Sequence, residues 1–256
     1  MPIDRRDFLR LAVAGIAMSS PLAPVEARSV ARARFPAVVF DAFPIFDPRP
    51  IFGLAEELFP GKGADLSAAW RTRQFEYQWL SALSGHYLDF WEATQNSLAF
   101  AAELLRLDLT DEKRARLMGA YLEMKTWPDV VSALGALKQT GVRLALLSNM
   151  TSKMLNANID SAGLEPVFEE VLSTDQIQAY KPDPRAYQMA VGALGLRREE
   201  ILFVAFAGWD ASGAKRFGYP TFWVNRLDLP AEKLGVAPDA AGRNLSDLVR
   251  FAMAPA

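Results

Sequence analysis

Hydrophobic and polar positions along the chain follow a repeating strand–helix pattern. Mostly apolar runs occupy residues 37–40, 142–147, 201–206 and 221–224, while residues 167–172 fit either a helix end or a short strand. Apolar runs of this length are typical of strands that are buried on both faces of a parallel sheet. Helical patterns separate these runs, so we predict an α/β fold with a doubly wound, Rossmann-like parallel sheet.

The stretch between the first two predicted strands contains helical periodicity only. Breaker residues at 61–63 and 84–85 divide it into separate helices. We therefore predict an all-helical cap at 48–126, inserted after the first strand into a core formed by 35–47 and 127–256. The expected cap helices cover residues 51–59, 66–83, 89–105 and 110–124.

The N-terminal segment differs from the rest of the chain. Arg5 and Arg6 precede an apolar run at 11–18, and residues 25–27 (VEA) fit a signal-peptide cleavage site. The Arg-Arg-x-Phe-Leu pattern resembles a twin-arginine signal, which exports folded proteins, so we expect residues 1–27 to direct the protein to the periplasm. The apolar run is too short for a stable membrane anchor. A frayed basic helix without a targeting role is the alternative.

Composition narrows the possible chemistry. The chain has 256 residues, of which 51% are hydrophobic and 23% charged, with a net charge of −2, so we expect no nucleic-acid partner. The absence of cysteine excludes disulfides, thiolate metal sites and a cysteine nucleophile. The single histidine, His86, excludes a multi-histidine metal site and is the only residue around which a Ser-His triad could form.

Polar residues follow several of the predicted strands or stand in adjacent loops. Each has an ordinary explanation: a turn former for Asp41, helix caps for Ser148-Asn149 and Asp210, and a solvated loop residue for Lys181. Because the carboxyl ends of parallel strands share one edge of the sheet, we expect these groups to converge there, where ligands bind.

The residues around Asp41 favour attack on carbon. Phe43 stands where an acid is common in loops that serve phosphate chemistry, and a lone carboxylate among apolar groups suits attack on carbon better than metal-assisted phosphoryl transfer. Asp210 is the only acid between residues 204 and 218, whereas a metal site usually needs several carboxylate or water oxygens. We therefore expect neither a metal nor a cofactor. A buried carboxylate gains reactivity from losing water if a cation such as Lys181 keeps it ionised. The aromatic residues expected to keep the site dry are Phe43, Phe90 and Trp209.

Seven short motifs carry a family resemblance over residues 36–226. They are FDAF at 40–43, WRTRQFEY at 70–77, DFW at 89–91, LSN at 147–149, YKP at 180–182, GWD at 208–210 and GAK at 213–215. With these motifs the sequence resembles the haloacid dehalogenase superfamily, and specifically its L-2-haloacid dehalogenase (type II) branch. The LSN and YKP motifs mark the superfamily broadly, whereas WRTRQFEY and GWD are specific to the branch.

The resemblance implies a role for each matching catalytic residue. Asp41 would displace the halide from C2 and form an ester, and Arg71 would face the leaving halide and the substrate carboxylate. Lys181 would keep Asp41 ionised and polarise the ester, and Asp210 would activate the water that hydrolyses it. Ser148 and Asn149 would hold the substrate carboxylate and halide. The full set of expected substrate-binding residues is Ser148, Asn149, Phe90, Tyr187, Trp209 and Phe43.

The sequence departs from the family pattern in two loops. Pro44-Ile45 replaces the usual Gly-Thr pair in a first loop that is one residue shorter. Ala205 and Ala207 stand where the family usually carries Ser and Asn, which help to hold the hydrolytic water. We therefore expect ester formation to be better preserved than ester hydrolysis.

The expected function is hydrolysis of short 2-haloalkanoic acids by an (S)-2-haloacid dehalogenase, with the haloacid and water as its partners. A Mg²⁺-dependent phosphatase of the same fold and a catalytically impaired carboxylate-binding protein are the alternatives. Apolar residues of the helical insert leave room for a homodimer face: Trp70, Tyr77, Trp79, Leu80 and Leu83.

Overall fold

The computed structural model describes residues 33–254, so the predicted signal at 1–27 lies outside the described residues. Six strands form one parallel sheet in the order β3-β2-β1-β4-β5-β6. The strands are β1 (Ala37–Phe40), β2 (Arg143–Ser148), β3 (Glu170–Ser173), β4 (Ile201–Ala205), β5 (Thr221–Val224) and β6 (Ala240–Gly242). The helices of the core are α5 (Val130–Gln139), α6 (Ser152–Ala162), α7 (Pro184–Leu194), α8 (Gly208–Phe217) and α9 (Leu245–Met253).

Both faces of the sheet are buried. Along β1, Ala37 and Val39 belong to one apolar cluster, and Val38 and Phe40 belong to another, because successive strand side chains point to opposite faces. Helices α7 and α8 cover the first face, and α5, α6 and α9 cover the second. The predicted doubly wound α/β fold is therefore confirmed.

Strand β1 lies at the centre of the sheet, where the chain order reverses. It pairs with β2 on one side and β4 on the other, and Phe40 aligns with both Leu146 and Val204. The next residue, Asp41, donates its backbone N–H to the Val204 carbonyl at 2.9 Å. Open α/β sheets bind ligands at this reversal point, outside the carboxyl ends of the strands.

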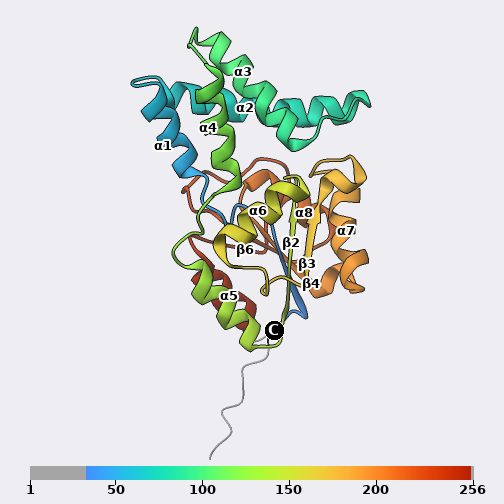
Figure 1. Ribbon diagram of the computed structural model, residues 1–256. Coiled ribbons are helices and arrows are strands. Elements are labelled where there is room, and N and C mark those ends of the chain that lie inside the picture. Colours follow the sequence, from blue (N-terminus) through green and yellow to red (C-terminus); the bar gives the residue numbers. More distant parts are fainter. Residues whose placement is uncertain (1–32, 255–256) are drawn as a thin grey trace, which may run out of the picture. The chain divides into compact units, whose positions relative to one another are not determined.

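Helices form the whole insert between β1 and β2 (Figure 1). They are α1 (Arg49–Leu58), α2 (Gly63–Ser84), α3 (Phe90–Leu104), α4 (Asp111–Gly119) and the 3₁₀ turn η1 (Ala120–Leu122). The chain enters and leaves this insert along adjacent segments, because Phe46 and Thr126 form an antiparallel bridge and Asp47 N–H bonds to the Lys125 carbonyl. The exact domain boundaries stay a prediction.

The packing of α2 corrects part of the expected dimer face. Trp70 is only 1% exposed, and its indole N–H donates to the Thr94 carbonyl of α3 at 2.8 Å. Trp79 is half-buried and donates to the backbone carbonyl of Lys181 at 3.1 Å. Leu80 and Leu83, by contrast, are 59% and 86% exposed. Trp70 therefore stabilises the insert and cannot contribute to a surface between copies.

Other sequence expectations need small corrections. The stretch expected as one helix at 110–124 ends as an α-helix at Gly119 and continues as η1. The ambiguous segment at 167–172 contributes to strand β3. Strand β6, which reads Ala-Ala-Gly, and helix α9 follow the strand that was expected to be the last.

Among residues 33–254, no helix combines the length and apolar character needed to cross a membrane.

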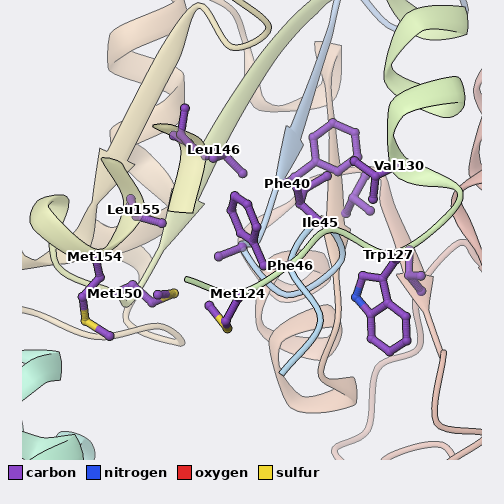
Figure 2. Close-up of a cluster of buried hydrophobic side chains, with 14 of the residues drawn as sticks. Phe40, Ile45, Phe46, Met124, Trp127, Val130, Leu146, Met150, Met154 and Leu155 are labelled. Carbon is purple, nitrogen blue, oxygen red and sulfur yellow. The ribbon is translucent and has the colours of Figure 1, made fainter. Parts of the chain in front are cut away.

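Side chains from β1 and the following loop pack into the core (Figure 2). Phe40 and Ile45 are fully buried, and Figure 2 shows them near Val130 at the start of α5. Phe46 is also fully buried, on the side of Leu146. The loop after β1 is thus anchored by its own apolar residues, which fixes the backbone that carries Asp41.

Candidate active site

A cavity of about 440 Å³ lies between the helical insert and the carboxyl edge of the sheet. This volume falls in the range of small-molecule sites. The predicted site residues that line the cavity are Asp41, Phe43, Arg71, Phe90, Ser148, Asn149, Lys181, Trp209 and Asp210. The convergence expected from the strand ends is therefore present in the geometry.

Lys181 lies between two carboxylates at the floor of this cavity. Its Nζ donates to Asp41 Oδ1 at 2.8 Å and to Asp210 Oδ2 at 2.7 Å. A third bond, at 3.2 Å, goes to the backbone carbonyl of Leu147. The lysine side chain is 1% exposed, so all three ammonium protons are used within the protein.

Burial and charge act in opposite directions on these groups. For Lys181, burial is the largest influence and lowers the pKa, but the charges of Asp210 and Asp41 outweigh it and hold the pKa above its usual value. For Asp210, burial raises the pKa to about 6 although the nearby Lys181 opposes that rise. At neutral pH the lysine therefore carries its proton, and Asp210 titrates only slightly below neutrality.

The two carboxylate oxygens of Asp41 have different surroundings. Oδ1 accepts the bond from Lys181, whereas Oδ2 accepts a longer one, 3.2 Å, from the backbone N–H of Phe43. Within residues 33–254 this N–H is the only hydrogen-bond partner of Oδ2. Oδ2 is therefore the oxygen better placed to react with a molecule in the cavity.

Asn149 connects the helical insert with the core. Its Oδ1 accepts from the backbone N–H of Lys181 at 2.9 Å and from the Thr174 hydroxyl at 3.2 Å. Its Nδ2 donates to Gln78 Oε1 on α2 at 3.3 Å. The neighbouring Ser148 ends β2, and its hydroxyl accepts from the Met150 N–H. The amide of Asn149 therefore orients both the lysine peptide and α2, besides lining the cavity.

Arg71 brings a positive charge from α2 into the cavity. Its guanidinium carbon lies 5.5 Å from the ring centroid of Phe52 on α1, a cation–π distance. It forms no ion pair with any residue from 33 to 254, whereas Arg73, two positions later, pairs with Glu76 at 2.8 Å. The guanidinium of Arg71 is thus available to an anion, and its fork geometry suits a carboxylate.

Aromatic side chains close the cavity on two sides. Trp209 contacts Phe75 and Trp79 of α2 edge-on, with ring centroids 5.6 and 5.4 Å apart. On the other side Phe43 packs against Phe206 at 5.9 Å. These rings exclude water from the carboxylates, which strengthens electrostatic interactions within the site.

The structure places Tyr187 away from the cavity, which corrects its expected role in shaping the substrate site. Tyr187 is fully buried on the α7–α8 side of the sheet, and its hydroxyl donates to Asp210 Oδ1 at 2.8 Å. Helical periodicity predicts that the side chain of Tyr187 faces inward. It does not distinguish the cavity from the apolar cluster between the sheet and helices α7 and α8. Tyr187 therefore orients Asp210 from below.

A family model described as haloacid dehalogenase-like hydrolase matches residues 32–218 of this sequence. The chain belongs to the haloacid dehalogenase-like hydrolase family. The family expected from the motifs at Asp41, Lys181 and Asp210 is thereby confirmed.

Two similar proteins of this family come from bacteria. Haloacetate dehalogenase H-2 of Moraxella sp. (strain B) is 42% identical over 204 residues, which cover 79% of this chain and 91% of that protein. The (S)-2-haloacid dehalogenase of Pseudomonas sp. (strain YL) is 42% identical over 203 residues, which cover 79% and 88%.

Solved dehalogenases of the family have the same fold. One L-2-haloacid dehalogenase aligns with a TM-score of 0.84 and 43% identity, covering 86% of this chain and 99% of that one. The enzyme of Xanthobacter autotrophicus with chloropropionic acid covalently bound aligns with a TM-score of 0.80 and 33% identity, covering 87% and 100%.

Several cavity residues were not predicted from the sequence. They are Phe52, Phe75, Tyr121, Phe206, Leu227 and Leu229. Phe75 could have been found, because it lies one helical turn after Arg71 and so shares its face of α2. The two leucines lie between β5 and β6 in a segment without helix or strand, where no periodicity indicates which side chains face inward.

Proposed function

We propose that this protein hydrolyses short 2-haloacids through an ester formed on Asp41. The observation that carries this proposal is the Asp41–Lys181–Asp210 arrangement at the floor of an apolar cavity with Arg71 in its wall. The dehalogenases that are 42% identical to this chain support the same reaction.

The first half of the reaction forms the ester. The substrate carboxylate binds Arg71 and the polar groups at the end of β2, which places C2 over Asp41. Oδ2 attacks C2 from the side opposite the halogen, the carbon–halogen bond breaks, and the halide leaves with the bonding electrons. One displacement at C2 inverts its configuration. Lys181 stays bonded to Oδ1, which becomes the carbonyl oxygen of the ester.

The second half of the reaction breaks the ester. Asp210 removes a proton from a water molecule, whose oxygen attacks the carbonyl carbon of Asp41. Lys181 stabilises the negative charge that develops on Oδ1. The bond between that carbon and Oδ2 then breaks, so Oδ2 leaves as the hydroxyl oxygen of the 2-hydroxyacid and takes the proton that Asp210 removed from water. Asp41, which keeps the water oxygen, returns to its ionised form with release of one proton.

The proposal is tested by following halide and oxygen together. Halide release is measured with (S)-2-chloropropionate and with a small panel of bromo- and fluoroacids. A single turnover in ¹⁸O-water should place the label in Asp41 and not in the hydroxyacid. Asp41→Asn should abolish halide release, while Asp160→Asn, which changes an exposed carboxylate of α6, should retain it. Label in the product of the first turnover would show direct attack by water.

The phosphatase alternative is less well supported. Lys181 already bridges Asp41 and Asp210, the two carboxylates that a divalent cation would bind. Among residues 33–254, no three histidine or acidic side chains are grouped closely enough to hold a metal ion. Phosphate release that depends on Mg²⁺ and survives Arg71→Ala would favour the phosphatase over the dehalogenase.

We also propose export to the periplasm and assembly into a homodimer. The N-terminal Arg5-Arg6 motif supports export, and the exposed Leu80 and Leu83 of α2 support a contact between copies. Cell fractionation with an Arg5-Arg6→Lys-Lys variant tests the first proposal. Light scattering of the wild type and of Leu83→Glu tests the second.

A further inference from the structure

The loop that follows β1 is held by residues far away in the sequence. This nucleophile loop, residues 41–48, places the Phe43 N–H against Asp41 Oδ2. The carbonyl of the same Phe43 accepts a hydrogen bond of 3.0 Å from the indole N–H of Trp127. The next carbonyl, of Pro44, accepts one of 2.9 Å from Arg226 Nη2. The peptide groups beside the nucleophile are therefore fixed by two side chains of the core.

Trp127 stands where the chain returns from the helical insert to the core. It is 5% exposed, and its backbone N–H donates to the Ile45 carbonyl at 3.1 Å, so both its indole and its backbone bind the loop. Figure 2 shows its ring close to Ile45 and Val130. The guanidinium carbons of Arg49 and Arg226 lie 4.3 and 4.5 Å from the ring centroid, which restrains the orientation of the indole.

Arg226 follows strand β5 and is held by an acid. Its side chain is 5% exposed and makes two hydrogen bonds to Asp129, at 3.0 and 3.2 Å. Asp129 also accepts the backbone N–H of Leu245 at 2.6 Å, which connects the pair to α9. Nη1 and Nη2 bind Asp129, and Nη2 also donates to the Pro44 carbonyl, whereas Nε has no hydrogen-bond partner within residues 33–254. Arg226 thus connects Asp129 of the core with the Pro44 carbonyl of the nucleophile loop.

Neither Trp127 nor Arg226 lines the cavity, so neither would touch a bound substrate. We propose that Trp127 and Arg226 are positioning residues, which orient the Asp41 carboxylate through the Phe43 and Pro44 peptides. This inference rests on the proposed role of Asp41 as nucleophile. It explains how a loop that lacks the usual Gly-Thr pair keeps its nucleophile aligned, since attack on carbon requires a narrow range of approach directions.

The test uses substitutions that remove single hydrogen bonds. Trp127→Phe removes the indole donor, and Arg226→Lys keeps the charge but loses the fork that spans Asp129 and Pro44. Trp70→Phe and Arg143→Lys are matched controls: Trp70 donates to a buried carbonyl in the insert, and Arg143 bridges Glu169 and the Leu194 carbonyl. All four variants are compared with the wild type in single-turnover ester formation and in KM.

We expect ester formation to slow by about 10- to 100-fold in Trp127→Phe and Arg226→Lys, with KM changed by less than about twofold. The controls should form the ester at nearly the wild-type rate. Wild-type ester formation in both test variants overturns the inference. So does an equal loss in all four variants that follows their melting temperatures, because it would reflect general destabilisation.

Hydrogen exchange supplies a measurement that does not depend on activity. Amide exchange of a peptide covering residues 42–47 should rise in Trp127→Phe and Arg226→Lys and stay at the wild-type level in the two controls. Unchanged exchange in both test variants overturns the inference. If the wild type forms no ester at all, the proposed function fails, and faster exchange in the test variants still supports the control of this loop by Trp127 and Arg226.

Discussion

The carboxyl ends of β1 and β4 lie side by side but differ in how they are built. After β1, both oxygens of Asp41 are hydrogen-bonded, and side chains from distant segments hold the following peptides. After β4, the chain reads Ala205-Phe206-Ala207, and no side chain caps the start of α8. A distant indole holds a carbonyl at both ends, since Trp223 donates to the Phe206 carbonyl at 3.0 Å, but the β4 end has no polar side chain of its own until Asp210.

This difference separates the two halves of the proposed reaction. Ester formation depends on groups around Asp41, whereas ester hydrolysis depends on water held near Asp210. Asp210 has Tyr187 and Lys181 as its side-chain partners, and the alanines before it offer no side-chain hydrogen bond to water. If the proposed reaction holds, we expect the groups for attack on carbon to be better preserved than those for water activation.

The largest expected effect comes from Asp210→Asn. Loss of the general base should slow ester hydrolysis by about 10²- to 10⁴-fold and leave ester formation within about tenfold of the wild type. Intact-protein mass spectrometry should then show the ester accumulating on Asp41. Asp239→Asn, which removes a surface partner of Lys215, is the control. Equal loss of both half-reactions in Asp210→Asn would contradict the division between the two strand ends.

Arg71→Lys should have the next largest effect. Lysine keeps the charge but cannot form the two parallel bonds that a guanidinium makes with a carboxylate, so kcat/KM should fall about 10- to 100-fold, mainly through KM. Arg73→Lys is the matched control on the same helix, because Arg73 stacks on Phe100 at 4.1 Å and lies outside the cavity lining. A fall of the same size in both variants would assign the effect to α2 stability.

The pH dependence should distinguish the two halves as well. Burial raises the pKa of Asp210 from 3.8 to about 6, so this group is protonated below pH 6 and no longer accepts a proton from water. Ester hydrolysis should fall about tenfold at pH 5 from its plateau. The same shift means that the contribution of Asp210 to folding stability increases as the pH falls through 6 towards 4.

Rapid-mixing measurements of both half-reactions between pH 5 and 8 check this prediction. In Asp210→Asn the residual hydrolysis should lose the acidic limb. An acidic limb that persists in that variant would assign the titration to another group.

The smallest expected effect is a gain. Ala207→Asn introduces an amide before Asp210, and ester hydrolysis should rise several-fold if the missing polar group limits water activation. Ala207 is also the N-cap residue of α8 and makes no side-chain capping bond, so Asn should add about 1 kcal/mol of stability. Ala207→Asp caps the helix equally well but places a second negative charge near Asp210. It should gain stability without gaining rate, and a rate gain in both variants would assign the effect to capping.

Sequence patterns predicted those parts of the fold that have strong local signals. Strand β1 and Asp41 could be found because an apolar run ends at a carboxylate, and the parallel sheet follows from repetition of that pattern. Strand β6 could not be found, since its Ala-Ala-Gly sequence has no apolar run and its position depends on pairing with β5. The 3₁₀ turn after Gly119 likewise has no distinct periodicity.

Site residues were predictable where one short motif carries the chemistry, as at Lys181 and Asp210. The position of Tyr187 beneath Asp210 was not, because it depends on how α7 and α8 pack together. Trp127 and Arg226 carry no local signal at all, since their importance arises only when the chain brings them to Phe43 and Pro44. Contacts between distant segments are the part of the site that single-sequence reasoning does not supply.

The central position of β1 also determines when the protein acquires its reactive group. Asp41 is translated early, but Lys181 and Asp210 are made much later, and β4 must insert beside β1 before Asp210 reaches the lysine. A nascent chain that stops before residue 210 therefore has no complete charge cluster. The strand that aligns Asp41 through the Val204 carbonyl is therefore itself made late, so the backbone around the nucleophile is complete only after β4 has paired with β1.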